Sequence, residues 1–352
     1  MIELHVAADD RTGALETAAA CADAGFRAVC VPWSVEPPAA GFDVVVADLG
    51  TRHVGAATAA RRARQVREVG VARAAHKIDS TLRGNWAREL AARAQRCAVV
   101  AAFPAAGRTC VDGVMLDHGI PVADGHAGRD VRMPVHWSRP ADHLAAARAG
   151  RVAHARDAAA LDAWIAGTER FVVVDAADDG ALGEAVALIA RRADILLAGS
   201  AAAIGALARS LAPAGARRVA VPPVRAPVLV VVGSQHPVAL DQLVRLEADL
   251  VATGRTDVSV LRAPAEPRNP RRVLAALAGR AQAARRAVRP ASLVVIGGDT
   301  AAAVLGDAPM IVEGTHGTGV ARCRFVDDDL VVLTRPGGFG GPDALVELVG
   351  PA

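Results

Sequence analysis

The sequence predicts an α/β fold with two domains, each a mostly parallel sheet flanked by helices. Short Val-rich runs alternate with segments of helical period over almost the whole chain. That alternation is the pattern of parallel sheets covered by helices. The chain has 352 residues, of which 52% are hydrophobic and 22% charged. This length and composition suit a globular protein of two domains better than a single core.

The elements follow from the period of the apolar residues. Short runs rich in Val, Ile and Leu predict strands, and they lie at 3–8, 28–32, 43–48, 75–78, 97–102, 170–175, 194–198, 227–232, 258–261, 292–296 and 330–334. Between them, segments with apolar residues three or four apart predict helices. These segments lie at 14–24, 55–74, 85–95, 157–166, 180–192, 201–211, 237–252, 270–288 and 300–305.

Two irregular stretches interrupt this alternation. The Pro- and Arg-rich segment 221–227 suits a stiff extended connector, so we place the domain boundary there and expect domains at 1–222 and 226–352. The second stretch, 104–150, has scattered Pro, Gly, His and Asp residues without periodicity. Loops of that length inside compact domains usually carry function or move.

Composition argues against several classes of function. The chain has no Tyr, six Phe, four Trp and a net charge of +3, so it lacks the aromatic platforms and the basic footprint of a nucleic-acid-binding protein. No apolar run has the length of a membrane span. The five cysteines have no C-x-x-C spacing and the histidines no metal-like spacing. We therefore expect reduced core thiols, a cytoplasmic location and no identifiable metal ligand.

Lys77 is the only lysine among 40 basic residues. Lysine is a compact point charge on a flexible stem, whereas arginine is a wide planar fork. The count of one lysine is compatible with a site that needs an ammonium in a small space and equally with survival by chance. The neighbours of Lys77 favour the site, because the segment 76–85 combines cations, a carboxylate and hydroxyls.

Polar residues gather at the ends of predicted strands. Asp9 and Asp10 follow the first strand, Arg52 follows the third, and Lys77 opens a further polar segment. Ligands of open α/β sheets bind at the carboxyl ends of the strands, so a shared ligand site is favoured over separate helix-capping roles. Several cations beside carboxylates suit a sugar acid. Arg52 would clamp its carboxylate, and Asp10 or Asp79 would accept hydrogen bonds from its alcohols.

The carboxyl-terminal half has a different set of motifs. Predicted strands there end in Gly233-Ser234 and in Gly297-Gly298-Asp299-Thr300, and a glycine-rich turn follows at 336–341. Glycines at strand-to-helix turns let backbone amides approach phosphate oxygens. Three such turns in one half favour nucleotide phosphates over ordinary tight turns. The P-loop motif G-x-x-x-x-G-K-[ST] is absent.

With these motifs in place, the chain resembles the four-carbon acid sugar kinases, which phosphorylate tetronates or 3-oxo-tetronates with ATP. Ala8–Ala14 is similar to the family's D-D-x-T-G-A, Thr51-Arg52 to its T/S-R motif, and Lys77–Gly84 to its K-x-D-S-T-x-R-G. The resemblance spans nearly the whole chain and continues in Pro104–Thr109, Gly113, Asp130, Pro134 and the three glycine turns.

The chain departs from the family pattern at two positions of the carboxyl-terminal half. Gln235-His236 stands where the family usually has a second small hydroxyl residue, and Arg335 stands where lysine is usual. The arginine agrees with the general replacement of lysine in this chain.

The resemblance implies an amino-terminal sugar-acid domain, a carboxyl-terminal ATP domain, and transfer of the γ-phosphoryl group to a terminal hydroxyl in the cleft between them, with Mg²⁺ on the nucleotide. It implies catalytic roles for Lys77 and for Asp10 or Asp79, either of which would serve as the base. The residues implied to bind the sugar acid are Asp9, Asp10, Arg52, Lys77, Asp79, Ser80, Thr81, Arg83 and Arg108. Those implied to bind the nucleotide are Ser234, Gly297, Gly298, Asp299, Thr300, Gly337, Gly338 and Gly340.

Two other classes of function compete with a kinase. A non-catalytic sugar-acid-binding or regulatory protein would keep the first set of motifs beside a degenerate nucleotide site, and it would not consume ATP. A dehydrogenase on a doubly wound sheet is disfavoured, because the dinucleotide motif G-x-G-x-x-G is absent. The sequence is compatible with an oligomer of identical chains.

Overall fold

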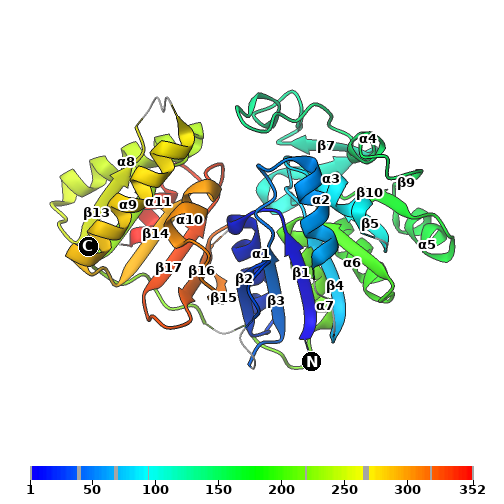
Figure 1. Cartoon of the computed structure of the whole chain (residues 1–352), viewed down its shortest axis with the longest axis horizontal. Helices are drawn as coiled ribbons and strands as arrows, with labels where there is room; N and C mark the ends of the chain where they lie inside the picture. The colour runs from blue at the N-terminus through cyan, green and yellow to red at the C-terminus, as the bar shows by residue number, and fades with distance from the viewer. Residues whose placement is uncertain are drawn as a thin grey trace.

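The computed structural model describes residues 2–37, 41–66, 70–93, 95–218, 220–264, 269–317 and 319–350. Figure 1 shows two halves side by side, each with strands at its centre and helices outside. This arrangement confirms the predicted α/β class. Where we expected one sheet in each domain, however, a single sheet of 14 strands runs through both halves.

The amino-terminal half contributes parallel strands to this sheet. In sheet order they are β2 (Ala28–Pro32), β3 (Val44–Asp48), β1 (Ile2–Ala8), β4 (Val71–Lys77), β11 (Ile195–Gly199), β5 (Arg96–Val100), β10 (Phe171–Val174) and β9 (Val152–Ala155). The central strands are buried on both faces, and they consist mainly of Val and Ala without a polar alternation. Because neighbouring strands are parallel, their carboxyl ends share one edge of the sheet.

The carboxyl-terminal half contributes both parallel and antiparallel strands. From the outer edge, β13 (Val258–Arg262), β12 (Val228–Val232), β14 (Ser292–Ile296) and β17 (Val331–Arg335) are parallel. They are followed by β16 (Ala321–Phe325) and β15 (Met310–Thr315), which pair antiparallel.

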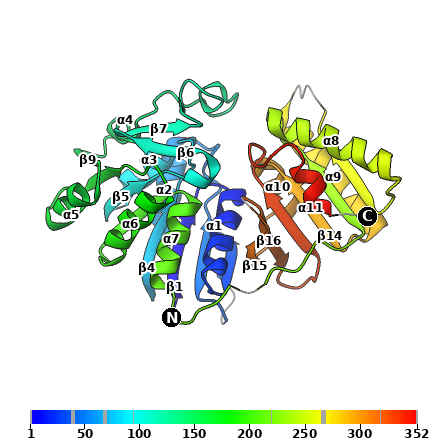
Figure 2. The ribbon, with the colours of Figure 1, turned by 180° about the vertical axis from the view of Figure 1, so that it is seen from behind.

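The two halves are joined by pairing between β15 and β2. These strands are antiparallel, with Met310 opposite Cys30 and Val312 opposite Ala28. Helix α1 (Arg11–Asp23) covers the junction, because it packs on β2 and β3 and also on β15 and β16 (Figure 2). Most residues of α1 are buried. A helix enclosed in this way has room mainly for small side chains, which accounts for its many alanines.

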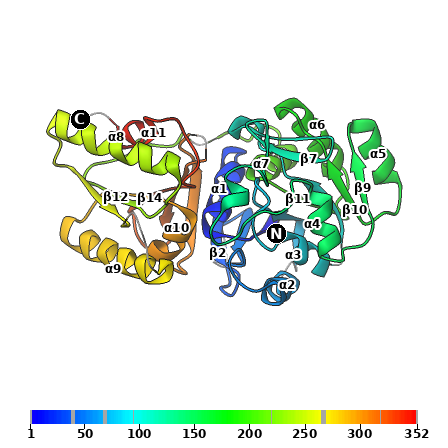
Figure 3. The ribbon, with the colours of Figure 1, turned by 90° about the horizontal axis from the view of Figure 1, so that it is seen from above.

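The remaining helices form layers on both faces of the sheet (Figure 3). In the amino-terminal half, α7 (Ala201–Leu211), α6 (Asp179–Ala190) and α5 (Ala158–Ala166) continue the layer of α1, whereas α2 (Ala56–Gln65), α3 (Trp86–Ala92) and α4 (Pro140–Ala146) lie together on the other side. In the carboxyl-terminal half, α8 (Pro237–Thr253) packs with α11 (Ala344–Val349), and α9 (Pro270–Val288) packs with α10 (Gly298–Leu305).

Some sequence-based boundaries are wrong. The helix expected over 55–74 ends at Gln65. Residues 71–77 form β4, because the pairing of β4 with β1 and with β11 outweighs the helix propensity of alanine. Residues 67–69 of that segment, and residue 94 of the helix expected over 85–95, lie outside the described residues. The sequence analysis also did not predict β9, β15, β16, α4 and α11.

The stretch 104–150 contains more regular structure than its lack of periodicity indicated. Strands β6 (Arg108–Val111), β7 (Val114–Asp117) and β8 (Ile120–Pro121) form a small antiparallel sheet within it. Two short 3₁₀ helices precede and follow this small sheet in the chain, at Pro104–Ala106 and Ala127–Arg129. These strands are too short to give a recognisable alternation of polar and apolar residues.

The expected connector contains no regular element, because the described residues of 212–227 form neither helix nor strand. The division into domains at 1–222 and 226–352 stays a prediction. All five cysteines are buried and free, as the sequence analysis expected. Within the described ranges, no helix combines the length and apolar character needed to cross a membrane.

Candidate active site

The polar motifs of the amino-terminal half meet at one edge of the sheet. Strands β3, β1 and β4 are neighbours, and Ala8 at the end of β1 lies opposite Asp48 of β3 and Lys77 of β4. The backbone amide of Arg52 also donates to the carbonyl oxygen of Asp9 at 3.0 Å. The sequence expectation that these strand ends come together is confirmed by this register.

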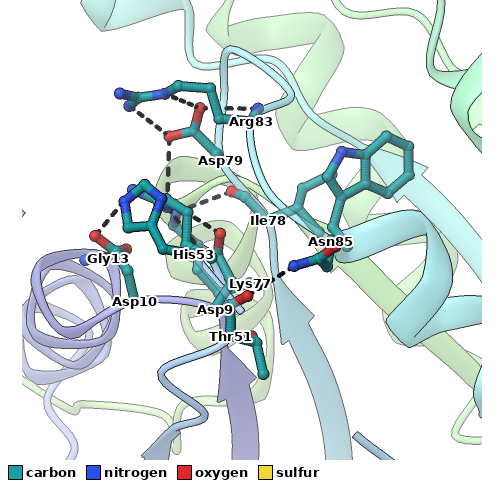
Figure 4. A network of polar contacts seen from close by, with 12 residues as sticks. Asp9, Asp10, Gly13, Thr51, His53, Lys77, Ile78, Asp79, Arg83 and Asn85 are labelled. Atoms are coloured by element: carbon teal, nitrogen blue, oxygen red, sulfur yellow. Dashed lines mark hydrogen bonds and ion pairs between the residues drawn. The ribbon is translucent and has the colours of Figure 1, made fainter. Parts of the chain in front are cut away.

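Arg52 contacts three carboxylates of the resulting network. Figure 4 shows these three, Asp9, Asp10 and Asp79, near one another. The Nε and Nη2 atoms of Arg52 donate to the two oxygens of Asp9 at 2.8 and 2.9 Å, and its Nη1 donates to Asp10 Oδ2 at 2.9 Å. Nη2 also lies 3.5 Å from Asp79 Oδ1. The bidentate clamp that we expected Arg52 to offer a substrate is therefore made to Asp9, because this buried carboxylate needs a partner. In this structure Arg52 orients three carboxylates.

Asp79 is held from several directions. Arg83 Nε and Nη2 each donate to it at 3.0 Å, and the Thr81 hydroxyl and the backbone amide of Arg83 also donate. Burial alone would raise the pKa of Asp79, but Arg83 and Arg52 outweigh burial and hold this pKa well below its ordinary value. Asp79 is thus a fixed anion.

The chain needs glycine just after this loop. Gly84 has a φ of +95°, and a Cβ there would lie 2.8 Å from Asp9 Oδ2. A larger residue would therefore be strained and would displace Asp9.

Asp10 has a different environment. It caps the amino terminus of α1 by accepting a hydrogen bond from the backbone amide of Gly13 at 3.0 Å. Burial raises the pKa of Asp10 and outweighs the opposing effect of Arg52, while Asp9 raises this pKa further. Asp10 and Asp79 are thus close together in one network but shifted in opposite directions, a pattern that separates a proton acceptor from a fixed charge.

Lys77 is the last residue of β4 and is only 3% exposed. Its Nζ donates to the carbonyl oxygen of Ile78 at 2.8 Å. It also packs against Gly13, where a Cβ would lie 3.1 Å from Nζ. The narrow space between β4 and α1 accounts for a lysine here, because the wider guanidinium group would collide with α1.

Arg108 and Ser80 extend the site toward the carboxyl-terminal half. Arg108 Nη1 donates to Ser80 Oγ at 3.1 Å, and Arg108 Nε lies 3.6 Å from Asp117. The guanidinium group also stacks over the ring of Phe339, 4.6 Å from its centroid. Arg108 is therefore in contact with both sets of motifs.

The glycine turns of the carboxyl-terminal half also converge, because β12, β14 and β17 are adjacent. A Cβ on Gly297 would lie 3.2 Å from the Cβ of Ser234, and one on Gly337 would lie 2.7 Å from the same atom. A Cβ on Gly338 would lie 2.9 Å from His236 Nε2. The three turns thus form one surface of closely spaced backbone.

This surface meets the amino-terminal network. A Cβ on Gly298 would lie 2.8 Å from Asp10 Oδ2, which places the amino terminus of α10 directly against the Asp10 carboxylate. Asp299 pairs with Arg132 and lies 3.3 Å from His53 Nε2. The rings of His126 and His236 lie 4.1 Å apart, centroid to centroid. The structure therefore brings together both sets of residues named from the sequence.

Several residues at this site were not predicted from the sequence, namely Glu16, His53, Arg132 and Gln242. Gln242 of α8 donates from Nε2 to the carbonyl oxygens of Phe339, Gly340 and Gly341 at 3.1, 3.1 and 2.7 Å, and its Oε1 accepts from Arg335. The signal for His53 was its position beside Arg52, but for Gln242 the sequence offered none, because it lies within a long helix.

Comparisons with known proteins agree with this geometry. The model of the family described as the sugar-binding N-terminal domain matches residues 4–207. A D-threonate kinase from Bordetella bronchiseptica is 31% identical, and the alignment covers 97% of this chain and 96% of that protein. The chain belongs to the four-carbon acid sugar kinase family. Another relative, a D-erythronate kinase from Heliobacterium modesticaldum, is 36% identical over 42% of this chain and 36% of that protein.

Solved structures resemble this family member over nearly its whole length. A Salmonella typhimurium LT2 protein, described as a putative tRNA synthase, has a TM-score of 0.79 at 19% identity, with 98% of both chains covered. That likeness supports the fold alone. A Bordetella bronchiseptica protein described as a domain of unknown function, with bound citrate and as a domain-swapped dimer, has a TM-score of 0.53 at 27% identity, covering 98% of this chain and 96% of that one.

Proposed function

We propose that this chain transfers the γ-phosphoryl group of ATP to a terminal hydroxyl of a four-carbon sugar acid, such as a tetronate or 3-oxo-tetronate. The observation that carries the proposal is the contact between Asp10 and Gly298, because it joins the sugar-acid motif to the phosphate-type turn at the start of α10. The names of the relatives, D-threonate kinase and D-erythronate kinase, support the same substrate class.

The sugar acid would bind among the cations and carboxylates at the ends of β1 and β4. Lys77, Arg83 and Arg108 supply positive charge for its carboxylate. Ser80 and Thr81, with the carboxylates of Asp10 and Asp79, provide hydrogen-bond partners for its hydroxyls. Asp9 and Arg52 would keep this arrangement fixed.

Asp10 is the proposed base. Asp79 is a poor proton acceptor, because Arg83, Arg52 and Thr81 stabilise its charged form. Asp10 has a raised pKa and lies next to the nucleotide turn. In the proposed step the hydroxyl proton moves to Asp10 as the hydroxyl oxygen bonds to the γ-phosphorus, and the bond from phosphorus to the β,γ-bridging oxygen breaks.

The nucleotide would bind at the surface formed by Ser234, Gly297, Gly298, Asp299, Thr300, Gly337, Gly338 and Gly340. Backbone amides at the start of α10 suit phosphate oxygens, since the helix dipole favours negative charge there. Mg²⁺ usually binds through substrate phosphates, waters and one or two carboxylates. The oxygen donors of this turn fit that pattern, with Asp299 as the protein carboxylate that would hold the ion. Bound there, Mg²⁺ would neutralise charge on the β- and γ-phosphates.

No group of three His, Cys, Asp or Glu side chains in the described parts of the chain is arranged to hold a metal of its own. The ion is therefore proposed to arrive with the nucleotide. We also propose a cytoplasmic location, because all five cysteines are buried and free. A homo-oligomer is part of the proposal, since a relative forms a domain-swapped dimer.

The test is a product assay on the intact chain. The protein is incubated with Mg-ATP and a panel of four- and five-carbon sugar acids, and phosphorylated acid is measured by mass spectrometry beside ADP formation. We expect equal amounts of ADP and phosphorylated acid with at least one tetronate. A tetronate that raises the melting temperature without any ADP formation would instead support the non-catalytic binding protein.

A further inference from the structure

Glu16 is a buried carboxylate whose Oε1 atom has no hydrogen-bond partner. It lies on α1, is 7% exposed, and forms no hydrogen bond or ion pair with any described residue. Its Oε1 atom is enclosed by the protein. Another buried glutamate, Glu89, has one oxygen 2.8 Å from His76 Nε2. An unsatisfied carboxylate in the interior is unfavourable for folding, so its presence calls for a functional explanation.

Glu16 lies on the face of α1 that meets the active site. Residues three and four apart are neighbours on a helix surface, so Gly13 and Thr12 lie one turn before Glu16. Gly13 lies against Lys77 Nζ, and Thr12 lies against Gly298. Among the charged neighbours of Glu16, Lys77 and Arg108 lower its pKa, and Asp10 and Asp79 raise it.

Thr12 provides a second observation that points to a ligand. Its Oγ1 atom is also buried without a hydrogen-bond partner, and the residue is 2% exposed. Two polar side chains, one turn apart on the same helix face, thus both lack partners beside the sugar-acid motif. A ligand carrying several hydroxyls would satisfy both.

We infer that Glu16 accepts a hydrogen bond from a carbinol hydroxyl of the sugar acid and so determines specificity for that hydroxyl. This inference rests on the proposed function. A carboxylate among two cations and two acids repels the acid group of the substrate, which therefore lies toward Arg108 and Lys77. The terminal hydroxyl lies toward Asp10, and a hydroxyl between the two ends of the acid faces Glu16.

The test compares three acids with the intact wild-type chain, Glu16→Gln and Glu16→Ala. The acids are 2,3,4-trihydroxybutanoate, its 2-deoxy analogue and its 3-deoxy analogue. We expect wild type to lose at least about 100-fold in kcat/KM on one deoxy analogue, because a site built for a hydroxyl rejects a ligand that lacks it. Both variants are expected to lose about 10- to 100-fold on the full acid and to discriminate little between the acids.

A merely structural role for Glu16 would lower activity on all three acids equally and leave the discrimination unchanged, which would overturn the inference. Glu184→Gln, the same chemical change on an exposed face of α6, is the matched control and is expected to behave as wild type. Glu16→Gln has nearly the same shape as glutamate, so it keeps the test valid if Glu16→Ala fails to fold.

Calorimetric titration of the same acids separates the two proposals. If wild type binds the full acid but does not phosphorylate it, the proposed function fails, and weaker binding by Glu16→Gln of the full acid alone would still support the inference. If wild type phosphorylates the acid and Glu16→Gln keeps the wild-type discrimination, only the inference fails. If wild type neither binds nor phosphorylates any of the acids, both fail.

Discussion

At the scale of single residues, the site depends on arginines that set the charge of neighbouring carboxylates. Arg52 contacts Asp9, Asp10 and Asp79, whereas Arg83 contacts Asp79 and Asp130. This difference leaves the pKa of Asp79 lowered and the pKa of Asp10 raised by burial. One network thus holds two carboxylates whose pKa values are shifted in opposite directions.

Replacement of Lys77 is the first test at this scale. Lys77→Ala removes a charged donor from a site shielded from water, and we expect turnover to fall by about 30- to 1000-fold. Lys77→Arg should also fail although it keeps the charge, because Gly13 closes the space around Nζ. Turnover of the tetronate is the measurement, with thermal unfolding as the control. Near-wild-type turnover of Lys77→Arg would contradict this role.

We expect Glu16 to make the free energy of unfolding of the ligand-free protein depend on pH. Burial is the largest cause that raises the pKa of Glu16 to about 7, with Asp10 and Asp79 acting in the same direction and Lys77 and Arg108 against it. The unfolded chain loses this proton near its ordinary value of about 4.3. The folded state therefore binds the proton more tightly, and the free energy of unfolding falls as pH rises from about 4 to 7.

Glu16→Gln removes the loss of stability that accompanies ionisation of the buried carboxyl group. We expect the variant to exceed wild type in the free energy of unfolding by up to about 3 kcal/mol at pH 8, and by much less at pH 5. Urea unfolding of the ligand-free protein at both pH values measures the difference. A variant less stable than wild type at pH 8 would mean that Glu16 has a stabilising partner.

The sequence located most of the candidate site because the residues lie in short motifs directly after strands, as Asp10, Arg52 and Lys77 do. Parallel pairing then brings the strand ends together without further information. Glu16 could not be found in this way. A single acid within a helix usually faces solvent, but α1 packs on strands of both halves and on α7, and most of its residues, Glu16 among them, are buried.

At the scale of elements, the glycine-rich turn after β17 is held by α8. Gln242 donates to three successive carbonyl oxygens of the turn, and Arg335, which is 1% exposed, donates to Gln242. Burial lowers the pKa of Arg335 to about 10. The turn is thus fixed in place before any nucleotide binds, which reduces the entropy lost on binding.

Gln242→Leu tests this arrangement. The substitution leaves three carbonyl oxygens and Arg335 without their partner, so the turn should lose its fixed shape. We expect the KM for ATP to rise about tenfold or more while binding of the sugar acid is unchanged. Steady-state kinetics and calorimetry measure the two effects. Val244→Ala on the exposed side of α8 is the matched control, and an unchanged KM for ATP in Gln242→Leu would contradict the proposed role.

Elements with a clear period were predicted well, but those defined by tertiary contacts were not. The segment 71–74 has helix-forming residues, yet it pairs with β1 and forms the first part of β4, whose later residues also pair with β11. β15 and β16 were not predicted from the sequence. β15 pairs with β2, which is distant in sequence, and β16 pairs with β15. Such long-range pairing leaves no local signal.

At the scale of the whole molecule, the continuous sheet makes the two halves depend on each other. Removal of the carboxyl-terminal half abolishes the pairing of β15 with β2 and the contacts of β15 and β16 with α1. A chain of residues 1–222 would expose the apolar edge of β2 and one side of α1, which favours association.

We therefore expect the fragment 1–222 to associate and to melt at a lower temperature than the whole chain. Size-exclusion chromatography and circular dichroism measure these properties, with the full chain as reference. A monomeric fragment with the melting temperature of the full chain would instead establish 1–222 as an independent domain.

We propose that phosphoryl transfer takes place where Asp10 of one half meets Gly298 of the other. Single-turnover kinetics with saturating Mg-ATP and tetronate tests this most directly, with wild type, Asp10→Asn and Asp79→Asn compared by rapid quench. General-base catalysis typically contributes about 10²- to 10⁴-fold. We expect Asp10→Asn to slow phosphoryl transfer by such a factor with the acid still bound, and Asp79→Asn to weaken acid binding mainly. Transfer at the wild-type rate in Asp10→Asn would contradict the account.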